Sequence, residues 1–380
     1  MKIPHYLQTF KCIGGACEDN CCIGWDVDID QSTYEKYQRV TQPVMKREFQ
    51  RYVKKNPHMV HPSINYAFVV LTEEKKCSFL NADHLCMIQK HLGETYLSNV
   101  CDSFPRITNR IDGNTERFAT ASCPEVARML VFEPGAMNLV EVAEPHHMPL
   151  ITYDLKQNAK NYRGKLLQHL LVVRNRCVRF FDEEEDLMVA LYKMGHYLTH
   201  LATLEMNGTL NLMNNWKAPL IGSNRLHRFP FILPIQEELI RQLMALGISD
   251  SPRYVELTER AEKGDLIKGA SRLEQVLTEH PHVLKNYFKN HLYKNLFPFS
   301  EGANVEEGYQ LLLVRYGIII RQLMGLAGSD SAFELNEIAE YLQVFSKVIE
   351  HHKHFETEMA MILKKKRIRL MRDLLEVPRV

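Results

Sequence analysis

The sequence has no excess of charge of either sign: 47 lysines and arginines stand against 46 aspartates and glutamates, a formal net charge of +1. Proteins that bind nucleic acid through their overall charge carry a basic excess, so we expect no nucleic-acid partner. Long apolar runs are also missing. Residues 311–327 form the most apolar stretch, but Arg315 and Arg321 interrupt it and it is shorter than the roughly 20 residues that span a membrane. We therefore expect no membrane partner.

A secretory signal is missing as well. The first residues, MKIPHYLQTFKCIGG, contain neither an uninterrupted apolar segment nor a small-residue cleavage site. The sequence therefore predicts a cytoplasmic protein, and stable disulfides are rare in that compartment. The apolar fraction of 45% is that of an ordinary globular protein, and a length of 380 residues predicts two domains.

Cysteine is almost absent from the last two thirds of the chain, where Cys177 stands alone. Because disulfides are disfavoured, the concentration of the other eight favours metal binding by four or more of them. The competing interpretation is buried free cysteines that pack as small apolar side chains, which we favour for Cys177. The eight N-terminal cysteines are Cys12, Cys17, Cys21, Cys22, Cys77, Cys86, Cys101 and Cys123.

The cysteine spacing bears on the kind of metal site. Structural zinc sites usually pair cysteines two to four residues apart, and only the first four cysteines resemble this pattern. Iron–sulfur clusters accept the wider spacing of the later four, because a larger inorganic core gathers thiolates from distant loops. Cys123 is followed by Pro124, and the last cysteine of the bacterial ferredoxin motif is also followed by a proline.

The fold class that we predict is mainly α, with a small cysteine-rich metal-binding N-terminal module followed by an all-α helical domain. The module covers residues 1–132, a linker with three prolines covers 133–150, and the helical domain covers 151–380. Short strands are expected in the module at Val27–Ile29 and Phe68–Leu71.

Helices are predicted by apolar residues at spacings of three and four. In the module we expect helices at 32–40, with Ser32 as N-cap, and at 86–91, ended by Gly93. In the helical domain the expected helices are 160–181, 183–206, 234–247, 253–262, 271–280, 282–296, 304–326, 333–351 and 353–375.

Several strings of the sequence are similar to one known family. They are FKCIGGACEDNCCIGWDVDID (10–30), CSFLNADHLCMIQKHLGE (77–94), CDSFPR (101–106), SCPEVARML (122–130), NYFKNHLYKNLFPF (286–299) and VIEHHKHF (348–355). Together they resemble the flagellin lysine-N-methylase family, whose N-terminal part is similar to zinc- or iron-chelating domains with clustered cysteines. The resemblance spans most of the chain, and the cysteine pattern is its most specific part.

The resemblance implies methyl transfer from S-adenosylmethionine to lysine side chains of flagellin, with participation of an iron–sulfur cluster of the [4Fe-4S] type. The sequence departs from the common donor-binding patterns. It has no glycine-rich loop between a strand and a helix. Cys22 also follows Cys21 too soon for the Cys-x3-Cys-x2-Cys motif of radical enzymes, which Cys17 and Cys21 begin. The residues alone therefore do not indicate how a donor binds.

Lysine methylation needs a neutral amine, so a site must remove a proton from the acceptor. Glu350 and His351 form a candidate pair for this role, and Asn290 is a candidate to hydrogen-bond the substrate. Trp25 is a candidate aromatic wall for the cationic donor. Each of these residues has a structural alternative. Glu350 and His351 are then solvated polar side chains, the asparagine lies on a helix surface, and the tryptophan packs in a core.

Two further interpretations stay open. In the first, the chain is a metal-chelating or electron-transfer iron–sulfur protein without methylase activity. In the second, it is a scaffold with structural zinc whose helices bind a partner.

Overall fold

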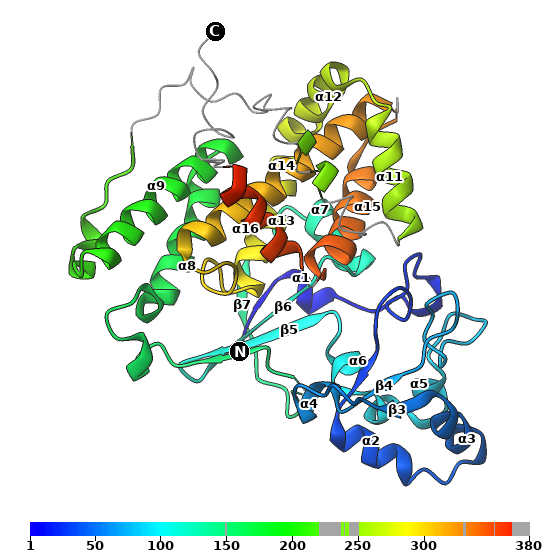
Figure 1. Cartoon of the computed structure of the whole chain (residues 1–380). Helices are drawn as coiled ribbons and strands as arrows, with labels where there is room; N and C mark the ends of the chain where they lie inside the picture. The colour runs from blue at the N-terminus through cyan, green and yellow to red at the C-terminus, as the bar shows by residue number, and fades with distance from the viewer. Residues whose placement is uncertain are drawn as a thin grey trace.

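The computed structural model describes residues 1–148, 150–219, 237–238, 240–242, 251–329, 332–352 and 354–366. Helices predominate, which confirms the prediction of a mainly α protein. Figure 1 shows a large helical body and, below it, a smaller module built from the N-terminal part of the chain. A sheet of extended strands lies at the lower side of the body.

The smaller module is built on an antiparallel sheet with the order β2-β4-β3. The strands expected at 27–29 and 68–71 are present as β2 and β4, and they pair with each other. The module has its own apolar core, in which Tyr37 stacks on Phe49 at 3.9 Å between ring centroids. Its elements are β2 (Asp28–Ile29), α2 (Gln31–Gln38), α3 (Pro43–Tyr52), β3 (Val53–Lys55), α4 (Pro62–Asn65), β4 (Ala67–Val69), α5 (Met87–Leu92) and α6 (Asn99–Ser103).

The start of α2 differs from the prediction. Asp30, not Ser32, is the N-cap, and its carboxylate accepts a hydrogen bond from the Thr33 amide at 2.9 Å. The same carboxylate accepts from the Asn99 amide at 2.9 Å, so one side chain caps α2 and fixes the start of α6. Gly93 ends α5 as expected, with a φ of 90°.

The second sheet has five strands in the order β7-β1-β6-β5-β8. β5 and β6 form an antiparallel hairpin, while β1 joins β6 and β8 joins β5 in parallel. β7 lies inside the segment predicted as a linker, and β8 lies inside the domain predicted as all-α; the structure corrects both expectations locally. The strands are β1 (Lys2–Pro4), β5 (Arg106–Ile111), β6 (Asn114–Ala119), β7 (Leu139–Glu141) and β8 (Tyr153–Leu155).

The helical body agrees with most of the predicted helices. The helix expected from residue 160 begins only at Leu170, after short 3-10 turns, and most of the helix expected at 234–247 lies outside the described residues. A π-helix, Ser346–Glu350, follows α15 directly. The helices are α7 (Pro124–Phe132), α8 (Leu170–Glu183), α9 (Leu187–Met206), α11 (Pro252–Glu262), α12 (Leu266–Glu279), α13 (His282–Lys294), α14 (Val305–Ser329), α15 (Leu335–Phe345) and α16 (Phe355–Lys366).

The division between the two cores differs from the boundary expected at residue 132. The larger core extends from Tyr6 to Leu363 and includes Phe118 of β6 and Leu130 of α7. Tyr6, the β5–β6 hairpin and α7 therefore pack with the helical body. The short strands and helices between β2 and α6 surround the smaller core.

α14 is the central helix of the body. It is long and apolar enough to cross a membrane by composition, but 94% of its most apolar window is buried inside the protein. Two arginines that interrupt its sequence, Arg315 and Arg321, are also buried. Close backbone contact with α11 and α12 is possible because glycines lie where the helices touch: a Cβ on Gly325 would lie 2.1 Å from the carbonyl oxygen of Ala261, and one on Gly269 would lie 1.8 Å from that of Met324.

We predict that Gly325→Ala strongly destabilises the protein, because the added methyl group forces the backbones of α11 and α14 apart. Because the clash is with backbone atoms, which cannot rotate away, we expect a cost at the upper end of overpacking, about 3 kcal/mol or more. Gly164→Ala is the matched control: Gly164 has a φ of 74° but nothing within 4 Å of a Cβ, so it carries only the local cost of about 1–2 kcal/mol. Urea unfolding measures both changes, and an equal loss for the two variants would contradict the packing argument.

Candidate functional site

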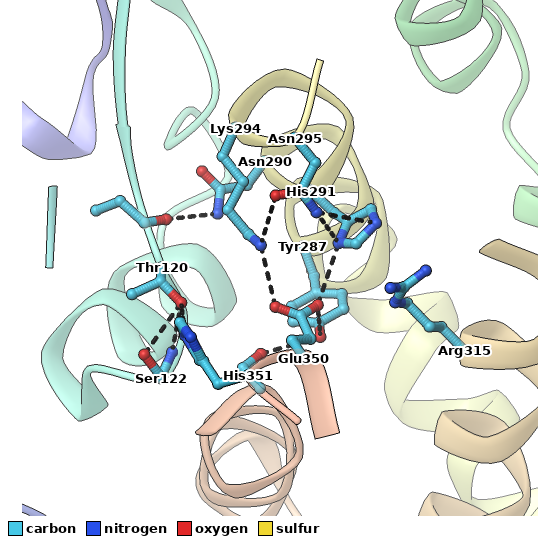
Figure 2. Close-up of polar contacts among 12 residues, drawn as sticks. Thr120, Ser122, Tyr287, Asn290, His291, Lys294, Asn295, Arg315, Glu350 and His351 are labelled. Atoms are coloured by element: carbon cyan, nitrogen blue, oxygen red, sulfur yellow. Dashed lines mark hydrogen bonds and ion pairs between the residues drawn. The ribbon is translucent and has the colours of Figure 1, made fainter. Parts of the chain in front are cut away.

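A cluster of ionisable side chains is buried where α13, α14 and the π-helix meet (Figure 2). The Glu350 carboxylate is at its centre. It accepts hydrogen bonds from the Tyr287 hydroxyl at 2.9 Å and from the Lys294 ammonium at 3.1 Å. The His291 Nδ1 atom lies 3.1 Å from the same carboxylate. Three neighbours from α13 thus hold Glu350, whose side chain is only 4% exposed.

A second buried carboxylate, Glu301, completes the cluster. Arg315 and Asn295 each donate to it at 2.8 Å, and His291 Nε2 lies 3.3 Å from its Oε1 atom. The imidazole of His291 therefore stands between the two carboxylates. Lys294 and Arg315 bring two positive charges to two negative ones, and this pairing makes burial of the charges tolerable.

The pKa values of the two carboxyl groups follow from this pairing. Burial alone would raise the pKa of Glu301, but Arg315 and His291 outweigh it and lower the pKa to about 2. Burial likewise opposes ionisation of Glu350, and the charge of Lys294 with the hydrogen bond from His291 holds its pKa well below the usual range. Both groups are therefore ionised at neutral pH.

The sequence brings these side chains together through helix geometry. Tyr287, His291 and Lys294 recur at spacings of four and three, so they share one face of α13. Glu350 comes from the π-helix, an element that occurs often at functional sites. The turn after α13 contains Leu296 with a φ of 51°, an uncommon backbone conformation for a branched residue beside a candidate site.

A cavity of about 210 Å³ lies beside the cluster. Glu356 is at its open side, with 44% of its side chain exposed, and burial together with the charge of Glu301 raises the pKa of this carboxyl group. The cavity is lined by Tyr153, Lys294, Glu301, Glu350, His351 and Glu356, among others. Its lining has three carboxylates against the two cations Lys294 and Arg315, and this excess of negative charge favours a cationic guest.

His351 lines this cavity and is uncharged at neutral pH. The residue is solvent-exposed, and its Nε2 atom lies 3.4 Å from the Thr120 hydroxyl (Figure 2). Crowding by protein and the positive charge of Lys294 lower the pKa of the imidazole. A neutral imidazole at the edge of an acidic cavity has the protonation state that a proton acceptor needs.

The structure brings together three of the four residues proposed from the sequence as catalytic or donor-binding. Glu350 and His351 are neighbours in the chain, and the Trp25 ring meets the His351 ring edge-on at 5.2 Å. Asn290 is nearby but faces the sheet: its amide donates to the Ala119 carbonyl at 2.8 Å and accepts from Tyr6 at 2.8 Å. This buried Asn290 side chain has a structural role that accounts for its presence.

Sequence patterns missed the partners of Glu350. Lys294 lies 56 residues before Glu350, and Arg315 lies 14 residues after its partner Glu301, so no local motif links them. One clue was present: Arg315 interrupts the most apolar stretch of the sequence. An arginine inside a buried helix needs a carboxylate partner, and Glu301 is that partner.

Five of the eight N-terminal cysteines gather in the smaller module. The Cys22 thiol is hydrogen-bonded to Cys21 and to Cys77, which lowers the pKa of Cys77 and lowers that of Cys21 to about 7. Burial raises the pKa of Cys86 and that of Cys101, and the nearby Cys77 and Cys21 raise both further. Thiols from four separate segments therefore converge.

The other three cysteines of this set form a looser group. Burial, together with the nearby Cys17 and Cys12, raises the pKa of Cys123 to about 12. All nine cysteines of the chain are free thiols, and Cys177 is buried in the larger core as expected. Across the described ranges, no three cysteine, histidine or acidic side chains are arranged to hold a metal ion. Metal binding by these thiols therefore stays a prediction.

A larger cavity of about 900 Å³ lies against the five-stranded sheet and α8. Arg174 and Glu116 form a buried ion pair on its wall, and Trp216 adds an aromatic surface. This volume is within the roughly 300–1,000 Å³ of typical small-molecule sites. Tyr293 lines the larger cavity and the next residue, Lys294, lines the smaller one, so both cavities border the end of α13.

Comparison with known proteins shows one family. Residues 182–376 match the model of the FliB lysine N-methylase C-terminal domain. The chain is 32% identical over 142 residues to the lysine-N-methylase of Salmonella typhimurium, covering 36% of this chain and 34% of that protein. It is also 32% identical over 142 residues to the flagellar biosynthetic protein FliU of Salmonella muenchen, covering 80% of that protein. The matched region thus spans about a third of the lysine-N-methylase. No solved structure matches.

We predict that Glu301→Gln destabilises the protein by about 3–5 kcal/mol at pH 7, because it leaves Arg315 buried without its main partner. The carboxyl group titrates at 4.5 in a model compound and at about 2 in the folded protein, so its contribution is complete above pH 4.5. This contribution to stability is lost as the pH falls from 4.5 towards 2. The difference in unfolding free energy between the parent and Glu301→Gln should therefore shrink over that range.

Urea unfolding at pH 7, 5 and 3 measures this deficit. Glu183→Gln is the control, since Glu183 is 45% exposed and pairs with Arg176 at the surface, where an ion pair contributes at most about 1 kcal/mol. A deficit for Glu301→Gln that does not change with pH would contradict the assignment of an ionised Glu301.

Proposed function

The chain belongs to the FliB lysine N-methylase family, and from this premise we propose that it methylates lysine side chains of flagellin with S-adenosylmethionine as the methyl donor. The observation that carries the proposal is the acidic cavity beside His351. A lysine side chain is a flexible cation, and a small space bordered by Glu301, Glu350 and Glu356 attracts one.

The residues around the cavity have distinct roles in this proposal. Glu356 meets the incoming ammonium group and holds it beside the cavity. The neutral imidazole of His351 takes the proton that the amine must lose before it can attack a methyl group. Crowding by protein and the charge of Lys294 lower the pKa of His351 and keep it uncharged. Lys294 is also bonded to Glu350, so Glu350 orients its neighbours while His351 accepts the proton.

When bound, S-adenosylmethionine supplies the methyl group, whose bond to sulfur breaks as its bond to the amine nitrogen forms. The chain offers aromatic and acidic surfaces that suit a sulfonium cation. Trp25 beside His351 is one of them, although its ring already has the Lys347 ammonium 5.3 Å from its centre.

We further propose that Cys21, Cys22, Cys77, Cys86 and Cys101 provide the ligands of an iron–sulfur cluster. The convergence of five thiols from separate segments supports this, because thiolates are the usual ligands of such clusters. When bound, a cluster supplies either an electron-transfer centre or an iron with an open coordination position. A reducing cytoplasm keeps these thiols available.

The second candidate function is a metal-chelating or electron-transfer protein without methylase activity. The same group of thiols favours it, since their convergence needs no methyl acceptor. A methylation assay separates the two: flagellin is incubated with the cluster-loaded protein and S-adenosylmethionine, and the mass of its lysine-containing peptides is measured.

We predict methyl mass increments on flagellin lysines and a loss of about 10²- to 10⁴-fold in kcat for His351→Gln, the usual contribution of a general base. His352→Gln is the matched control, because His352 follows His351 in the chain but does not line the cavity. Unmodified flagellin with intact, loaded protein would overturn the proposed activity. Equal rates for the two variants would instead overturn the role of His351.

We also predict that Cys77→Ser and Cys101→Ser lose iron after anaerobic reconstitution, while Cys12→Ser and Cys177→Ser keep it. The first two thiols belong to the converging group, whereas Cys12 lies near Cys123 and Cys177 is in the larger core. Iron and sulfide analysis together with visible absorbance measures the loading. Iron retention by both Cys77→Ser and Cys101→Ser would contradict the assigned ligand set.

A further inference from the structure

The cysteine-bearing segment at residues 17–25 is joined to the π-helix by one lysine. The Lys347 ammonium is paired with the Asp19 carboxylate, and both side chains are largely buried, at 11% and 14% exposure. Gln343, one helical turn earlier, donates to the same carboxylate at 2.8 Å and to the Ser122 carbonyl at 3.0 Å. Asp19 therefore has two partners on the α15–π-helix segment.

The same lysine contacts Trp25. Its ammonium lies 5.3 Å from the centre of the Trp25 ring, within the range of a cation–π interaction. The Trp25 indole N–H donates to the Cys21 carbonyl at 2.5 Å, so the ring is fixed to the backbone that carries two of the converging thiols. The ring also meets two other rings edge-on: Phe104 at 5.5 Å, and His351 at 5.2 Å with an interplanar angle of 80°.

These contacts form a continuous path from the backbone of Cys21 to the candidate proton acceptor. The path runs from Cys21 through Trp25 to His351, with Lys347 beside the first two: its charge contributes to the lowered pKa of the Cys21 thiol. Lys347 and His351 are four residues apart across the end of the π-helix. A displacement of the cysteine segment would therefore move Trp25 against the imidazole.

We propose that Lys347 is a positioning residue for methyl transfer, which holds Trp25 against His351 and so couples the geometry of the cysteine segment to that of the proton acceptor. The proposal rests on the proposed function. Lys347 does not line the cavity and does not contact the reacting atoms; it acts through Trp25 and Asp19. A misplacement of about 1 Å in a proton acceptor lowers a rate by up to about 100-fold, so a positioning contact has a measurable effect.

The first test reads the contact without relying on activity. In a Trp216→Phe background, Trp25 is the remaining tryptophan of the chain and reports its own surroundings by fluorescence. Lys347→Met should shift its emission and increase its quenching by acrylamide, while Lys347→Arg should keep both, since arginine also stacks on tryptophan. Lys193→Gln is the matched control, a partly buried lysine paired with Glu184 on the far side of the body. Unchanged emission in Lys347→Met would overturn the proposal.

The second test separates positioning from folding and binding. Lys347→Met should lower kcat for flagellin about 10- to 100-fold with KM unchanged, and Lys347→Arg should restore most of it. Equal kcat in Lys347→Met and the parent, with altered fluorescence, would overturn the coupling and leave the methylase activity standing. An inactive parent with intact Trp25 fluorescence would instead overturn the proposed function, so the two failures are distinguishable. Loss of the folded state in Lys347→Met is detected by its unfolding curve, and Asp19→Asn then replaces it in both tests.

Discussion

Two carboxylates buried beside two cations constrain the arrangement of the whole helical body. Each of these charges would cost several kcal/mol to bury alone, so Glu301 and Glu350 must stay within hydrogen-bonding distance of Arg315, Lys294 and His291. These five residues come from α13, the turn that follows it, α14 and the π-helix. A shift of any one of these elements leaves an uncompensated charge in the core. The cavity next to the cluster therefore has walls that are fixed before any substrate arrives.

The sequence predicted the helices far better than the sheet that supports them. Long amphipathic helices repeat their apolar spacing several times, so α9, α13 and α14 were found within a few residues of their ends. The strands β1, β7 and β8 have three residues each, too few to show an alternation. They exist because distant segments pair: β1 and β8 pair with the β5–β6 hairpin and β7 pairs with β1, and no local pattern encodes such pairing. The N-cap of α2 was predicted wrongly because aspartate and serine are both good N-caps. Asp30 also accepts a hydrogen bond from the Asn99 amide, a contact 69 residues away that local sequence does not reveal.

The candidate site was predictable only in part, for the same physical reason. Glu350 and His351 were found because they are adjacent in the chain, and Trp25 because it follows the cysteine pair. Their chemical properties, however, depend on partners that are distant in the sequence and close in the fold. Asn290 shows the reverse case: its position on a helix suggested a free amide, while Tyr6 and β6 use that amide for packing. The sequence also identified the eight thiols as a set. The thiols divide into two groups because the chain around Cys77 pairs with the chain around Cys22, where the Cys77 amide donates to the Cys22 carbonyl. The spacing of the cysteines does not predict this pairing.

The π-helix links the two halves of the molecule. A π turn contains one more residue than an α turn and costs stability in isolation, so partners must hold it in place. Ser346 is bonded to Tyr287, Lys347 to Asp19, and Glu350 to α13, which gives three of its five residues fixed partners. The contacts of Ser346 and Glu350 are with α13, on the side of the buried charges, and the contact of Lys347 is with the cysteine segment. The wider turn directs Lys347 to one side and Glu350 to the other within a single revolution of the helix. A regular α-helix would place residues three apart on nearly the same face, and the segment would then serve either the cysteine segment or the charge cluster, not both.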